Sequence, residues 1–163
     1  MIGSLALVGS GEYLPAMSEF ERSLLDDGVK NGKQPVYIQI PTAAGQESEA
    51  RLKYWQDLGQ RVADSIGVKS IFLPIFNRDD ANNQEFADQI NNAALIYLSG
   101  GDPHYLAKTL SNTKVWTAIS ENWQTGSSLA GCSAGAMVLS SHIPNFRVSK
   151  GDATPGLNLI PNI

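Results

Sequence analysis

Short apolar runs alternate along the chain with longer segments whose apolar residues recur at helical spacing. The apolar runs predict five β-strands, at residues 2–8, 35–40, 68–73, 94–98 and 128–132. The amphipathic segments predict helices at residues 17–25, 47–66, 105–110, 115–123 and 134–140, and one more that contains Phe86 and Ile90. Gly28 and Gly67 stand where the first two helices are expected to end. This alternation favours βαβ crossovers, so we expect a three-layer α/β fold with a mostly parallel sheet and helices on both faces.

Three glycine-bearing turns follow predicted strands, at residues 9–11, 100–101 and 131–135. In folds of this class, ligands bind outside the carboxyl ends of the strands, so the turns together indicate a site. The first turn lacks the third glycine of a dinucleotide-binding loop, because Leu14 stands in its place. We therefore expect no nucleotide there.

The third turn has the sequence G-x-S-x-G, with Ser133 at its centre and Gly131 and Gly135 on either side. A strand before it and small residues after it are typical of a nucleophile elbow, which lifts one serine above the sheet edge. The backbone N–H of Ala134 would then face a developing oxyanion. The alternative is a small-residue turn that packs a helix tightly on the sheet.

The second turn follows a strand expected to neighbour the elbow strand, and its Gly101 N–H offers a further oxyanion donor. Gly100 lets the backbone approach a substrate, and Asp102 is a candidate for the pocket. The simpler interpretation is a turn in which Asp102 caps a helix that begins with Pro103. Both interpretations can hold together.

Several other polar residues near the predicted turns are candidates for the site, and each also has a simpler interpretation. Cys132 flanks the elbow serine, and its side chain is expected to point into the core as an inert thiol. A continuous helix after Ser133 would carry His142 too far away to act as its base. His104 lies on the correct edge of the sheet and, with Glu12 and Thr42, is a candidate pocket residue. A solvated side chain is the alternative for His104 and Glu12.

The amino-acid composition and net charge narrow the range of functions expected for the chain. The chain has 163 residues, enough for one domain, with 42% hydrophobic and 17% charged residues, which is a globular composition. Its net charge of -4 argues against a nucleic-acid-binding surface. A single cysteine and no apparent signal peptide favour the cytoplasm. No apolar run is long enough for a membrane span, and no residue cluster has metal-ligand spacing.

The chain resembles the dipeptidase E and cyanophycinase family of serine peptidases, which have a class I glutamine amidotransferase-like fold of the flavodoxin-like type. The matching segments run in family order, at residues 8–12, 40–43, 99–102, 131–136 and 155–161. The resemblance implies that Ser133 is the nucleophile and that Gly101 and Ala134 supply the oxyanion N–H groups. It also implies a catalytic histidine shortly after the last segment, with an acidic residue to orient it, for which Asp152 is the candidate.

The printed chain stops at Ile163, before that histidine is expected, and family members are longer. We therefore expect one domain over residues 1–163 that is incomplete at its C-terminal end relative to the family. Three explanations stay open: a part of a longer enzyme, a short inactive relative, or a site completed by a partner subunit.

The expected function is hydrolysis of a peptide or amide bond in a small peptide, with aspartyl peptides suggested by the resemblance. No cofactor is expected, and a homo-oligomer is a possible assembly. The alternative is a non-catalytic amidotransferase-like domain that binds a small molecule or a partner protein.

Overall fold

The computed structural model of the protein describes residues 1–145 and 153–161. Its main sheet contains five strands, β1 (Leu5–Val8), β2 (Gln34–Ile40), β3 (Lys69–Phe72), β4 (Ala93–Leu98) and β5 (Ser128–Cys132). Every neighbouring pair is parallel, and the order across the sheet is β1-β5-β4-β2-β3. A small antiparallel pair joins β6 (His142–Ile143) to β7 (Thr154–Pro155). The predicted parallel sheet is confirmed.

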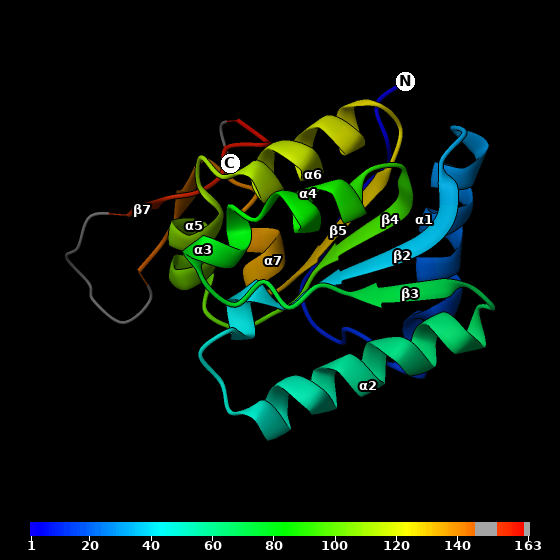
Figure 1. The fold of residues 1–163 in the computed structure, drawn as a ribbon, viewed down its shortest axis with the longest axis horizontal. Helices are drawn as coiled ribbons and strands as arrows, with labels where there is room; N and C mark the ends of the chain where they lie inside the picture. The colour runs from blue at the N-terminus through cyan, green and yellow to red at the C-terminus, as the bar shows by residue number, and fades with distance from the viewer. Residues whose placement is uncertain (146–152, 162–163) are drawn as a thin grey trace.

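Helices cover both faces of this sheet, as expected (Figure 1). The helices are α1 (Ser18–Lys30), α2 (Glu49–Ser65), α3 (Arg78–Ala81), α4 (Gln84–Ile90), α5 (Pro103–Leu110), α6 (Lys114–Gln124) and α7 (Ala134–Met137). Two single 3-10 turns, η1 (Pro15–Met17) and η2 (Thr42–Ala44), precede α1 and α2. Helices α1 and α2 pack on one face, and α4 to α7 pack on the other. The three-layer α/β architecture is thus confirmed.

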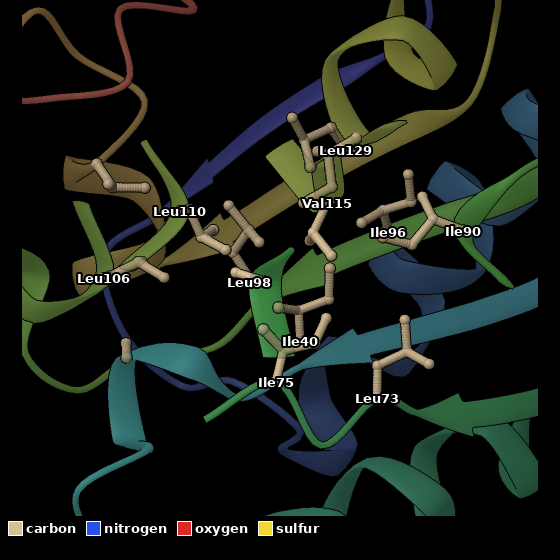
Figure 2. Close-up of a cluster of buried hydrophobic side chains, with 14 of the residues drawn as sticks. Ile40, Leu73, Ile75, Ile90, Ile96, Leu98, Leu106, Leu110, Val115 and Leu129 are labelled. Carbon is tan, nitrogen blue, oxygen red and sulfur yellow. The ribbon is translucent and has the colours of Figure 1, made fainter. Parts of the chain in front are cut away.

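Strand β4 lies in the middle of the sheet, and its six residues are all buried. A strand covered on both faces needs apolar side chains at every position, which explains its unbroken apolar sequence. On one face, Ile96 and Leu98 of β4 belong to a cluster with Leu106, Leu110 and Val115 from α5 and α6 (Figure 2). Each such side chain contributes about 1.5–3 kcal/mol when it leaves water. This packing fixes the carboxyl ends of the central strands.

Helix α1 extends past the glycine that was expected to end it. Gly28 lies inside the helix and is buried against β4, where an added Cβ would stand 2.1 Å from the carbonyl oxygen of Ala94. The glycine therefore serves close helix–sheet packing and does not stop the helix, which continues to Lys30.

Helix α7 is shorter than predicted and ends at Met137. Just beyond the helix, the carbonyls of Val138 and Leu139 accept hydrogen bonds from the N–H groups of Leu157 and Ile160. Residues much later in the chain thus supply the donors for these two carbonyls.

Candidate active site

Ser133 occupies a strained turn between β5 and α7. Its φ of 50° and ψ of -111° lie outside the regions that L-residues ordinarily adopt. A Cβ on Gly131 would stand 2.2 Å from the carbonyl oxygen of Gly135, so the two flanking glycines leave room for the turn. The Ser133 N–H donates to the carbonyl oxygen of Val8 on β1 at 2.8 Å, and the residue is exposed. Such strain, of order 1–3 kcal/mol, is characteristic of functional sites.

The turn after β4 lies next to this serine. Strand β4 pairs with β5 so that Leu98 stands opposite Gly131. Gly101 follows with a φ of 143°, and the next N–H, of Asp102, donates to the carbonyl oxygen of Ala43 at 2.8 Å. The prediction that the two glycine-bearing turns follow neighbouring strands is confirmed.

Two backbone N–H groups remain unused at these turns. Within residues 1–145 and 153–161, neither the N–H of Gly101 nor that of Ala134 donates a hydrogen bond. Free backbone donors beside an exposed hydroxyl are what an oxyanion site requires. The roles expected for Gly101 and Ala134 remain predictions.

Asp102 acts as a helix cap, as the simpler interpretation expects. Its carboxylate accepts from the N–H groups of His104, at 2.8 Å, and Tyr105, at 3.0 Å, and Pro103 opens α5. One carboxylate oxygen is therefore committed to the helix. Asp102 nevertheless also borders the cavity beside Gly101.

That cavity has a volume of about 660 Å³ and opens beside the Gly101 turn. Its lining residues are Glu47, Gly101, Asp102, Pro103, His104, Asn145 and Thr154. His104 Nδ1 lies 2.7 Å from the Thr154 hydroxyl, so its ring faces β7. Glu47 and Thr154 were not singled out from the sequence, because their proximity to the turn depends on tertiary packing.

Thr42 does not line this cavity. Its side chain is fully buried, and its hydroxyl donates to the carbonyl oxygen of Ile75 at 2.7 Å. That bond joins η2 to the loop after β3, and the pocket role expected for Thr42 remains a prediction.

Glu12 enters the site from the loop after β1. Its Oε2 accepts the N–H of Gly100 at 2.7 Å. Burial raises the pKa of this carboxyl, opposed by the Gly100 N–H and the Cys132 thiol, while the charge of Glu47 raises it further. The carboxyl is therefore a partly buried neighbour of the turn, and the fully solvated alternative does not hold.

Within the part of the chain that the structure describes, neither histidine is hydrogen-bonded to Ser133. His104 pairs with Thr154, and His142 lies exposed on β6 with its Nδ1 3.0 Å from the hydroxyl of Ser141. Asp152 lies outside the described residues. The residue that would take the Ser133 proton is thus not identified in this part of the chain.

Cys132 is buried, with 2% of its surface exposed, as expected. Burial, with the nearby charge of Glu12, raises the pKa of its thiol to about 12. Because only the thiolate reacts, we expect iodoacetamide to alkylate the native protein far more slowly than the protein in denaturant, as measured by intact mass. Equal rates in the two conditions would contradict an inert core thiol.

A second buried carboxyl, Glu21 on α1, was missed because a charged residue in an amphipathic helix is usually solvated. Glu21 is fully buried and accepts the Tyr37 hydroxyl at 2.7 Å. Burial raises its pKa from 4.5 to about 7; hydrogen bonds from Tyr37 and the Tyr13 backbone oppose the shift, and the charge of Glu12 adds to it.

The folded protein therefore binds the Glu21 proton more tightly than the unfolded chain does. This contribution to stability is fully present below pH 4.5 and is lost as the pH rises through about 7. We expect the loss to be about 3 kcal/mol and to be absent in Glu21→Gln, measured by urea unfolding across this range. The exposed Glu121→Gln variant is the control, and an unchanged pH profile in Glu21→Gln would contradict the prediction.

Two further observations concern the described residues only. They contain no group of three or more histidine, cysteine, aspartate or glutamate side chains that could hold a metal ion. Their helices include none with the length and apolarity needed to cross a bilayer.

Comparison with known structures gives a match over nearly the whole chain. A peptidase from an acI-B1 Actinobacterium is 63% identical with a TM-score of 0.94, and the match covers 96% of this chain and 64% of that one. A candidate peptidase E from Listeria monocytogenes shares the fold, with 24% identity, a TM-score of 0.67 and coverage of 98% and 76%.

Sequence comparison finds similarity to cyanophycinases. Cyanophycinase of Synechococcus elongatus is 28% identical over 137 residues, which is 77% of this chain and 41% of that protein. Cyanophycinase of Trichormus variabilis is 30% identical over 114 residues, or 63% and 38% of the two chains. The chain thus spans about two fifths of the length of these curated relatives. The model of peptidase family S51 matches residues 5–162, and the chain belongs to this family.

Proposed function

We propose that the protein is a serine hydrolase of the dipeptidase E and cyanophycinase type, which cleaves a peptide or amide bond in a small peptide. The observation that carries the proposal is the exposed Ser133 in its strained turn, beside the unused N–H groups of Gly101 and Ala134. Membership of family S51 supports the same chemistry.

In this proposal the Ser133 Oγ attacks the carbonyl carbon of the scissile bond and loses its proton to a base. The carbonyl π electrons move onto oxygen, where the N–H groups of Gly101 and Ala134 stabilise the charge. The C–N bond then breaks, the amine leaves with the proton, and an ester on Ser133 remains. Water hydrolyses the ester, releases the acid and restores the hydroxyl.

A second candidate is a domain of the same fold that binds a small molecule or a partner without catalysis. It is favoured by one observation: among the described residues, His104 and His142 are hydrogen-bonded to Thr154 and Ser141 and not to Ser133. A serine without a base is a weak nucleophile.

The resemblance to the dipeptidase E and cyanophycinase family suggests small aspartyl peptides as the substrate class. The cavity beside Gly101 is bordered by the carboxyl groups of Glu47 and Asp102, with His104 as the one ionisable nitrogen group among its described lining residues. An acidic substrate group placed there would meet like charges. The test must therefore include peptides of both signs.

The protein is incubated with aspartyl, neutral and lysyl dipeptides, and released amino acids are quantified by mass spectrometry. We expect turnover of at least one class by the wild type and none by Ser133→Ala. Absence of turnover across the panel, with a reproducible thermal shift by one peptide, would favour the binding domain instead.

A further inference from the structure

The carboxyl group of Glu12 lies where three turns of the site meet. Its Oε2 accepts the N–H of Gly100 at 2.7 Å. A Cβ added to Gly100 would stand 3.2 Å from that oxygen and 3.4 Å from the Cβ of Ser133. The carboxyl group, the Gly100 backbone and the serine side chain therefore surround one small volume.

The loop that carries Glu12 is itself firmly held. Gly11 and Tyr13 on either side have φ values of 91° and 61°, a sharp turn that directs the loop across the sheet edge. Tyr13 is only 2% exposed, and its hydroxyl lies 2.7 Å from that of Ser99. Its ring also packs against Tyr97 of β4, with centroids 5.2 Å apart.

Two consecutive loop residues thus hold two consecutive residues of the β4 turn. Tyr13 bonds Ser99, and Glu12 bonds Gly100, immediately before Gly101. The arrangement uses the N–H of Gly100, and within residues 1–145 and 153–161 the N–H of Gly101 stays free. On the far side, the Asp102 N–H bonds Ala43. The peptide groups on either side of the Gly100–Gly101 peptide are therefore both held by hydrogen bonds.

We propose that Glu12 is a positioning residue, whose hydrogen bond to Gly100 fixes the peptide that presents the Gly101 N–H to the oxyanion formed on attack by Ser133. This inference rests on the function proposed above. A misplacement of about 1 Å in such a group costs roughly 10²-fold in rate, so the hydrogen bond is expected to matter to the chemical step.

The negative charge of Glu12 distinguishes a positioning role from the binding of a cationic substrate group. A negative carboxylate beside a developing oxyanion disfavours the transition state, so the benefit of Glu12 must come from its hydrogen bond. A neutral acceptor of the same shape should therefore serve as well. If Glu12 bound a cationic part of the substrate, the neutral variant would fail.

The test measures the rate at which a fluorophosphonate probe inactivates the protein, resolved into KI and the limiting rate kinact. We expect kinact of Glu12→Ala to fall about 10²-fold with KI unchanged. Glu12→Gln should retain nearly the wild-type kinact, because its amide oxygen accepts the Gly100 N–H. Glu121→Ala, an exposed glutamate on α6, is the matched control and should leave labelling unaltered.

Two results would overturn the proposal while leaving Ser133 as the nucleophile: wild-type kinact in Glu12→Ala, or an equal loss in Glu12→Gln and Glu12→Ala. A wild-type protein that the probe does not label would overturn the proposed function and this inference together. If thermal unfolding shows that Glu12→Ala is not folded, Glu12→Asp replaces it, since its shorter side chain withdraws the acceptor from Gly100.

Discussion

Ser133→Ala is expected to lose about 10⁴–10⁶-fold in kcat/KM against any peptide that the protein hydrolyses, the loss typical of removing a serine nucleophile. The variant keeps the Cβ and removes only the hydroxyl oxygen. That oxygen forms the bond to substrate in the proposed reaction, and nothing in the turn replaces it.

The same substitution should leave the fold nearly unchanged. The Ser133 side chain makes no capping hydrogen bond to α7, and the residue is exposed. We expect a change in unfolding free energy within about 0.5 kcal/mol, typical of surface substitutions. A large loss of activity without a loss of stability distinguishes a nucleophile from a packing residue.

The measurement combines hydrolysis kinetics, fluorophosphonate labelling and thermal unfolding of both proteins. Ser23→Ala, an exposed serine on α1, is the control and should match the wild type in all three. Equal labelling of Ser133→Ala and the wild type would reject Ser133 as the nucleophile.

The features that the sequence predicts best are those fixed by nearby residues. The apolar runs place β4 and β5 to within one residue, because a strand buried on both faces needs apolar side chains throughout. The turn at Ser133 is similarly local, since the two flanking glycines leave room for its backbone. Helix ends are less predictable: α7 ends at Met137, and the carbonyls of Val138 and Leu139 just after it accept hydrogen bonds from Leu157 and Ile160.

The residues that the sequence predicts poorly owe their environment to distant partners. Glu12 meets Gly100 across 88 positions, and His104 meets Thr154 across 50. The sequence places Thr42 in a loop after a strand, but only the fold shows that its hydroxyl donates to the carbonyl oxygen of Ile75. No local periodicity encodes such pairs, so the turns of the site could be located while the partners of their side chains could not.

Gly101→Ala is expected to damage both the site and the fold. Gly101 has a φ of 143°, a region that side chains rarely adopt, and an added Cβ would stand 2.3 Å from the carbonyl oxygen of Ala43. That oxygen also accepts the Asp102 N–H, so the turn cannot move away without breaking a hydrogen bond. If the Gly101 N–H is displaced from the oxyanion, kcat should fall about 10²–10³-fold, the usual effect of losing one donor.

Gly32→Ala provides the matched control for backbone strain alone. Gly32 also has a positive φ, of 88°, but among the described residues no atom beyond its two chain neighbours lies within 4 Å of the position of an added Cβ. We expect Gly32→Ala to lower the unfolding free energy by about 1–2 kcal/mol through strain and to leave kcat unchanged. Gly101→Ala should lose more stability than the control, in urea unfolding, and should also lose activity. If its kcat equals that of Gly32→Ala, the Gly101 N–H takes no part in the reaction and the oxyanion must depend on Ala134 alone.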